Sequence, residues 1–161
     1  MRAVGHGLRV CFVQFLKGEW ESGEGKAAPL LSPGLELHVF GAPQWGERSK
    51  AAGGTPWWEL PPSEEDRRQA QEGILFAHRA VTSGEYDIVV LDEVLGAVKL
   101  GLVSLDEVMG LMSSKPATVE LVLTGRDAPD EVVKAADLVT EMKAVKHPYE
   151  RGVKARRGIE Y

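Results

Sequence analysis

The chain has 161 residues, of which 43% are hydrophobic and 27% charged, and its net charge is −5. These values are ordinary for one globular domain with its own core, so we expect a single domain over residues 1–161. A pI near 5.4 argues against a dedicated nucleic-acid binder, and no apolar run is long enough to cross a membrane. The single Cys11 cannot form an internal disulfide, and we expect a cytoplasmic protein.

Short apolar runs recur along the chain and predict strands. They occupy residues 8–16, 35–40, 86–91, 119–123 and 138–142. Helical patterns separate several of these runs. Strands that alternate with helices indicate an α/β fold, with a mainly parallel sheet flanked by helices.

Helix starts are marked by capping sequences. Ser63, followed by three acidic residues, predicts a helix that runs to about residue 82. Ser104 with Glu107 forms a capping box for another helix, and residues 129–136 predict a third. The residues of the first helix expected to face the core are Ile74, Leu75, Ala77, His78 and Val81.

Two carboxylates, Asp92 and Glu93, follow the apolar run at 86–91. A buried parallel strand would place them at the carboxyl edge of the sheet, where open α/β proteins bind ligands. Carboxylates there commonly hold Mg²⁺, which neutralises phosphate charge, and this pattern resembles a Walker B motif. A strand followed by an acidic helix cap is the alternative, and these residues alone leave both interpretations open.

Two cationic residues follow other predicted strands at the same edge. Arg126 comes after Thr124 and Gly125, and Lys17 ends the first strand. A guanidinium fork or an ammonium group at this position suits phosphate oxygens, although a solvated loop residue is the alternative. Three strands that each present a charged residue at one edge together favour a ligand that carries phosphate.

A long segment rich in Pro, Gly and Trp occupies residues 41–62. Long loops in compact domains are usually functional or mobile, and exposed aromatic side chains can cover a flat ligand. Trp45 is expected to pack on the core instead. The four histidines lack metal-ligand spacing, so neither a zinc site nor a Ser-His-Asp triad is predicted.

The last segment, residues 139–161, is cationic. It holds six Lys/Arg and three Glu, a net of +3, while the rest of the chain sums to −8. A cationic tail on an acidic body suggests a local anionic partner, and Lys154 is a candidate phosphate-binding residue within it. The alternative is that these cations pair with acidic surface groups, each pair contributing little.

Taken together, several sequence blocks closely resemble the ATP:corrinoid adenosyltransferases, the cob(I)alamin and cob(I)yrinic acid a,c-diamide adenosyltransferase family. The blocks are RAVGHG (2–7), VQFLKG (13–18), VVLDE (89–93), LVLTGR (121–126), ADLVTE (136–141), VKHP (145–148), GVKA (152–155) and RGIEY (157–161). They run in the family's order from residue 2 to residue 161.

The resemblance implies a RecA-like P-loop fold and transfer of the 5′-deoxyadenosyl group from ATP to reduced corrinoid, with release of triphosphate. By position it implies Mg²⁺ at Glu93 and Asp92, and ATP phosphates near Arg126. It also implies corrinoid contacts at Trp58 and Trp57, a homodimer, and a flavoprotein as reductant. No nucleic-acid or membrane partner is expected.

One departure from the family concerns the phosphate-binding loop. No G-x-x-x-x-G-K-[ST] motif occurs in the 161 residues. We therefore expect that a first strand with its P-loop belongs to a longer natural protein, and that its place is beside the strand at 89–92. We also expect the 161-residue polypeptide to bind MgATP poorly. The alternative is a corrinoid-binding relative without catalysis; a generic P-loop NTPase relative would not explain the tail.

Overall fold

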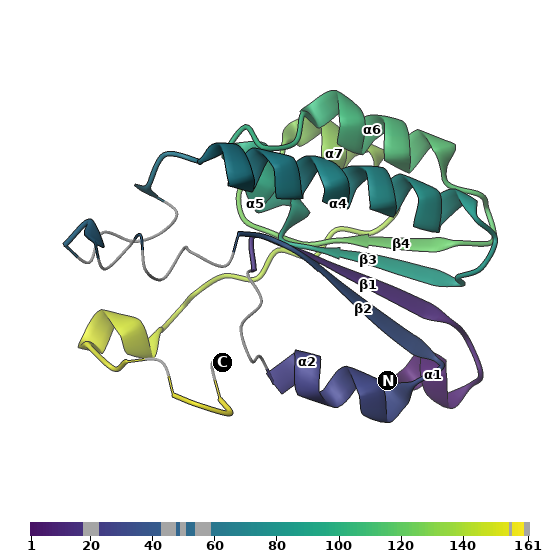
Figure 1. The fold of residues 1–161 in the computed structure, drawn as a ribbon, viewed down its shortest axis with the longest axis horizontal. Helices are drawn as coiled ribbons and strands as arrows, with labels where there is room; N and C mark the ends of the chain where they lie inside the picture. The colour runs from purple at the N-terminus through teal and green to yellow at the C-terminus, as the bar shows by residue number, and fades with distance from the viewer. Residues whose placement is uncertain (18–22, 43–47, 49–50, 54–58, 155, 160–161) are drawn as a thin grey trace.

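A four-stranded, all-parallel sheet forms the centre of the protein (Figure 1). The computed structural model describes residues 1–17, 23–42, 48, 51–53, 59–154 and 156–159. The strands are β1 (Val10–Phe15), β2 (Leu35–Phe40), β3 (Ile88–Asp92) and β4 (Glu120–Leu123), in the order β2-β1-β3-β4. The predicted α/β class and parallel sheet are confirmed.

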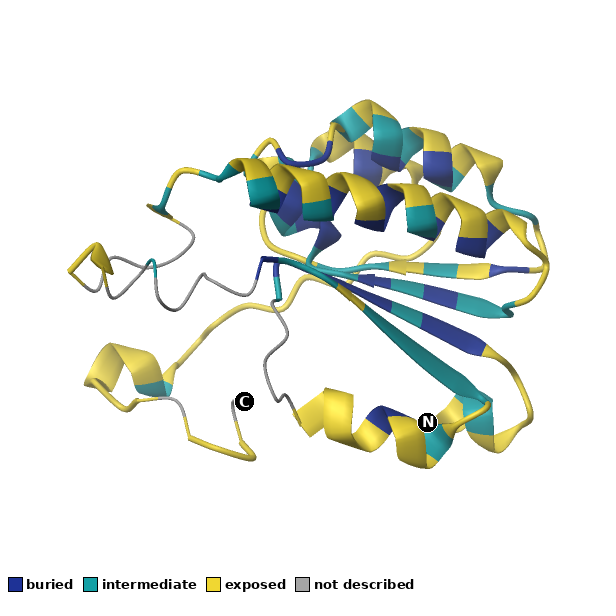
Figure 2. Cartoon of the chain, in the orientation of Figure 1, coloured by how far each residue is buried: buried dark blue, intermediate teal, exposed yellow. Residues whose placement is uncertain are grey.

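Burial follows the position of each strand in the sheet. Five of the six β1 residues are buried, because β2 and β3 flank this strand and its apolar run suits a covered sheet. By contrast, β4 lies at an edge and alternates between exposed and half-buried residues (Figure 2). The middle of the sheet is therefore its most protected part.

Helices lie on both sides of the sheet (Figure 1). One side carries α4 (Glu64–Thr82), α5 (Val94–Lys99), α6 (Leu105–Ser114) and α7 (Asp130–Ala135). The short helices α1 (Arg2–Gly5) and α2 (Gly23–Ala27), with the 3₁₀ turn η1 (Ala28–Leu31), lie on the other side. A second 3₁₀ turn, η3 (Pro148–Arg151), belongs to the tail. None of the helices in the described ranges is long and apolar enough to span a membrane.

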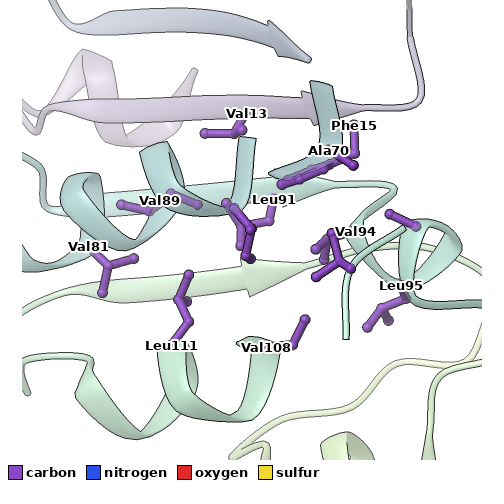
Figure 3. Close-up of a cluster of buried hydrophobic side chains, with 14 of the residues drawn as sticks. Val13, Phe15, Ala70, Val81, Val89, Leu91, Val94, Leu95, Val108 and Leu111 are labelled. Atoms are coloured by element: carbon purple, nitrogen blue, oxygen red, sulfur yellow. The ribbon is translucent and has the colours of Figure 1, made fainter. Parts of the chain in front are cut away.

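The main core lies between the sheet and α4, α5 and α6 (Figure 3). Its fully buried side chains include Phe15, Leu91 and Leu111, and each such side chain contributes roughly 1.5–3 kcal/mol relative to exposure. Gly73 lets α4 approach the sheet closely. A Cβ there would lie 2.9 Å from Cε1 of Phe15 and 3.0 Å from Cβ of Phe40.

The predicted N-cap Ser63 and the predicted capping box at Ser104 are confirmed, and Ser63 also forms a capping box. Ser63 and Asp66 cap α4 reciprocally, and Ser104 and Glu107 do the same for α6. The predicted core face of α4 is partly wrong. Leu75 is 58% exposed and His78 is also exposed, because the helix turns its small residues Ala70, Gly73, Ala77 and Ala80 toward the core.

Two further expectations are contradicted. Residues 138–142 form no strand, and Leu138 and Met142 are 85% and 93% exposed. A strand requires a neighbour to satisfy its backbone groups, and no described strand pairs with this segment. The place expected for a further strand, beside residues 89–92, is already filled, because β1 and β4 pair with β3 on its two sides.

A buried ion pair joins the segment before α4 to the start of that helix. The Asp66 side chain is 1% exposed, and its Oδ2 atom lies 2.6 Å from Nη1 of Arg48. The same oxygen accepts hydrogen bonds from the backbone N–H and the hydroxyl of Ser63, at 2.6 and 2.7 Å. Arg48 also donates from Nη2 to the carbonyl of Pro61. One carboxylate therefore serves as helix cap and as anchor for Arg48.

Cys11 lies in the core, at 0% exposure. Burial, with a smaller contribution from Glu36, raises the pKa of its thiol to about 12. We expect a thiol reagent such as DTNB to leave the native protein unmodified at pH 8 and to label one thiol per chain in denaturant. The absorbance of the released thiolate measures this reaction. Labelling of the native protein as fast as of a free thiol would contradict the burial of Cys11.

Candidate active site at the carboxyl edge of the sheet

The charged residues predicted to share an edge do follow neighbouring strands at their carboxyl ends. Asp92 is the last residue of β3, Lys17 lies two residues after β1, and Thr124 follows β4 directly. The parallel pairing of β1 with β3 and of β3 with β4 places these ends at one edge. This edge is the candidate site.

The Asp92 carboxylate is fully engaged by its neighbours. Its Oδ1 atom accepts a hydrogen bond from the Thr124 hydroxyl at 2.8 Å. Its Oδ2 atom lies 3.2 Å from Nζ of Lys17 and accepts a 3.3 Å hydrogen bond from Nε2 of Gln14. Asp92 thus ties together the ends of three strands.

Lys17 is an ion-paired cation at this edge. Its ammonium group lies between the Asp92 carboxylate and Oε1 of Glu24, which is 3.4 Å away. Burial lowers the pKa of Lys17, but the two carboxylates outweigh this effect and raise the pKa above the usual lysine value. Lys17 therefore stays protonated at neutral pH.

Glu93 differs sharply from its neighbour Asp92. It occupies the left-handed region with φ of 62°, caps α5, and donates its backbone N–H to the Thr124 hydroxyl at 3.0 Å. Its carboxylate makes no hydrogen bond or ion pair with any residue in the described ranges. Among the described residues, it is the carboxylate at this edge that is free to take a ligand.

Two glycines make room for this arrangement. A Cβ on Gly96 would lie 3.0 Å from Oε2 of Glu93, so a larger residue would crowd the carboxylate. Gly125 has φ of 144°, and a Cβ there would lie 2.7 Å from Cβ of Leu95 and 2.8 Å from the Gly96 nitrogen. The loop after β4 can therefore pack against the start of α5 only with glycine at 125.

The remaining cations of the prediction are exposed. Arg126 follows Gly125 on the loop after β4, where its charge helps to keep the pKa of Asp127 low, after the larger effect of Lys99. Lys154 lies in the tail and forms no hydrogen bond or ion pair with another described residue. No interaction thus joins Lys154 to Asp92 or Glu93. Trp57 and Trp58 lie outside the described residues.

The donors at this edge fit Mg²⁺ only in part. In the described ranges no group of three or more His, Cys, Asp or Glu could hold a metal ion. Magnesium in nucleotide sites often takes only one or two carboxylates, the remaining ligands being water and phosphate. The unpaired carboxylate of Glu93 fits one such ligand, whereas both oxygens of Asp92 already have partners.

Two residues of this network had no predicted role. Gln14 is 2% exposed inside an apolar strand, and a polar residue in such a strand is a signal that could have identified it. Thr124 meets Asp92 because Leu123 pairs with Leu91, so the next residues of the two strands lie side by side. The sequence alone does not reveal this contact, because it depends on the pairing of β3 with β4.

The parallel sheet and its charged carboxyl edge define an open α/β protein whose ligand site lies beyond the strand ends. The family model described as "ATP:corrinoid adenosyltransferase BtuR/CobO/CobP" matches residues 1–161. The chain belongs to this family of adenosyl-transferring enzymes.

The chain is also similar in sequence to proteins that are named as members of this family. Proteins named corrinoid adenosyltransferase from Pseudomonas aeruginosa and Escherichia coli K12 are each 35% identical to the chain. The alignments cover 99% of this chain and 73% and 74% of those proteins. The corrinoid adenosyltransferase CobA of Salmonella typhimurium is also 35% identical, with 99% of this chain and 74% of the relative covered.

Proposed function

We propose that the protein transfers the 5′-deoxyadenosyl group of ATP to the Co(I) centre of a reduced corrinoid, in cobalamin biosynthesis or salvage. The observation that carries this proposal is the family match over residues 1–161. The parallel sheet supports it, together with three cationic candidates and the Glu93 carboxylate, which has no partner among the described residues.

The reaction forms one bond and breaks one. The electron pair of Co(I) forms the cobalt–carbon bond at C5′, while the C5′–oxygen bond breaks and its electron pair leaves with triphosphate. Co(I) is a strong nucleophile, so the protein supplies no general base. Its contributions are to orient C5′ toward cobalt and to stabilise the negative charge on the leaving triphosphate.

Glu93 would hold the Mg²⁺ that accompanies ATP, and Asp92 beside it would complete the acidic edge. Bound Mg²⁺ supplies positive charge to the phosphate oxygens. The role of Glu93 is supported by its unpaired carboxylate and by its position at the edge.

The cations Arg126, Lys17 and Lys154 would contact the triphosphate. Arg126 is exposed, which leaves its guanidinium accessible to a ligand. Lys17 would exchange its contact with Glu24, which is 55% exposed, for a phosphate oxygen. Lys154 would reach the phosphates only if the tail folds toward the edge.

The corrinoid would lie against Trp58 and Trp57, because large aromatic side chains suit the face of a flat macrocycle. We further propose one RecA-like domain that acts as a cytoplasmic homodimer, with a flavoprotein as the reductant of cobalt. These assignments rest on family resemblance.

Adenosylation of chemically reduced cob(I)alamin with MgATP tests the proposal, with the purified protein assayed together with the P-loop segment expected for its natural form. We expect one photolabile adenosylated corrinoid and one triphosphate for each ATP consumed, followed by absorbance and anion-exchange chromatography. Corrinoid consumption without ATP, or release of phosphate and ADP in place of triphosphate, would contradict the proposed reaction.

A second candidate is a corrinoid-binding protein without catalysis. A fold that keeps its corrinoid contacts but does not bind ATP would have this property. A binding protein should bind corrinoid tightly, with an affinity that ATP does not change. An adenosyltransferase should bind both corrinoid and ATP. Titration of corrinoid absorbance with and without MgATP distinguishes the two.

A further inference from the structure

The Thr124 side chain connects the two carboxylates of the candidate site. Its hydroxyl donates to Oδ1 of Asp92 at 2.8 Å and accepts the backbone N–H of Glu93 at 3.0 Å. The Thr124 backbone adds two bonds, donating to the Leu91 carbonyl at 3.0 Å and accepting from the Leu95 N–H at 3.2 Å. Thr124 therefore contacts the β3 end on both sides of Glu93.

This contact has a conformational consequence for Glu93. A non-glycine residue in the left-handed region costs free energy and persists only where its surroundings hold it. The N–H of Glu93 is held by Thr124, and the same hydroxyl is directed by the Asp92 carboxylate. The direction in which the Glu93 side chain leaves the backbone thus depends on Thr124.

Both carboxylate oxygens of Asp92 already have partners, so this residue holds its neighbours in place. Its Oδ2 atom already faces the amide of Gln14 and the ammonium of Lys17, and its Oδ1 atom faces Thr124. A metal ion bound directly to Asp92 would displace at least one of these donors. Glu93 offers its carboxylate without any such exchange.

We propose that Thr124 is a positioning residue that, together with Asp92 as anchor, holds Glu93 in the orientation needed to bind the metal ion of MgATP. The inference rests on the proposed function, in which Glu93 is the metal ligand. Hydrogen-bonding partners that orient a ligand typically account for a 10–100-fold change in metal affinity or activity.

Mn²⁺ in the presence of ATP is the probe, because its EPR signal reports free ion, and the Mn²⁺ bound by the same concentration of ATP without protein is subtracted. Thr124→Val keeps the shape of the side chain and removes both hydroxyl bonds, whereas Thr124→Ser keeps them. We expect Thr124→Val to weaken Mn²⁺ binding about 10–100-fold and Thr124→Ser to restore it. In the adenosylation assay, Thr124→Val should raise the KM for Mg²⁺ more than it lowers kcat at saturating Mg²⁺.

Glu93→Gln tests whether Glu93 is the metal ligand, and Asp92→Asn tests whether Asp92 helps to position it. These two variants also test the proposal if Thr124→Val does not fold. We expect Glu93→Gln to abolish the tight Mn²⁺ site and Asp92→Asn to weaken it less. Normal Mn²⁺ affinity in Thr124→Val, with loss in Glu93→Gln, overturns the positioning role and leaves the proposed function intact. Equal loss in Asp92→Asn and Glu93→Gln overturns the anchor role. Normal Mn²⁺ affinity in Glu93→Gln overturns the proposed metal site itself.

Discussion

Replacing Glu93 by glutamine should lower the rate of corrinoid adenosylation at least about a hundredfold, because even the partners of a metal ligand typically account for 10–100-fold. Glutamine keeps the size of the side chain and removes its charge. The Glu93 carboxylate has no partner in the described part of the chain, so the fold should lose little when the charge is removed. Initial rates with chemically reduced cob(I)alamin measure the effect, and the thermal midpoint should remain close to that of the unchanged protein.

Glu120→Gln is the matched control for this substitution. Glu120 begins β4, at the opposite end of the strand from Thr124, and it is exposed. The change of charge is the same, but it lies away from the carboxyl edge. Rates that fall equally in both variants would indicate a general charge effect. Full activity of Glu93→Gln would mean that Glu93 does not bind the metal ion.

The fold could be predicted where local sequence and tertiary contacts agree. The apolar run within β1 predicts a covered strand, and pairing with β2 and β3 covers it. The N-cap at Ser63 and the capping box at Ser104 are local interactions, so the sequence alone identifies them. Residues 138–142 show the opposite case, since an apolar run becomes a strand only where a partner strand accepts its backbone groups.

The candidate site could be predicted only in part, because contacts between residues far apart in the sequence decide which carboxylate is free. The strand that ends in Asp92 and Glu93 identifies the edge, but the sequence does not distinguish the two carboxylates. Their difference comes from Thr124, which lies 32 residues away from Asp92, and from Gln14, which lies 78 residues away. Only strand pairing shows that Asp92 is engaged on both oxygens while Glu93 is not.

Replacing Asp66 by alanine should destabilise the protein by about 3 kcal/mol, at the lower end of the range for breaking a buried ion pair. The Asp66 side chain is 1% exposed, whereas Arg48 keeps 25% exposure and its bond to the Pro61 carbonyl, so the arginine charge is partly compensated when the carboxylate is removed. The substitution also removes the acceptor for the Ser63 N–H and hydroxyl at the start of α4. For a chain of this length, this loss corresponds to a fall in the thermal midpoint of roughly 6–12 °C.

Glu64→Ala provides the control on the same helix turn. Glu64 is exposed and interacts with the α4 dipole, so its removal should cost at most about 1 kcal/mol. Thermal unfolding followed by circular dichroism compares both variants with the unchanged protein. A midpoint for Asp66→Ala no lower than that of Glu64→Ala would mean that the Arg48–Asp66 pair contributes no net stability, because the cost of burying the two charges equals the energy of their contact.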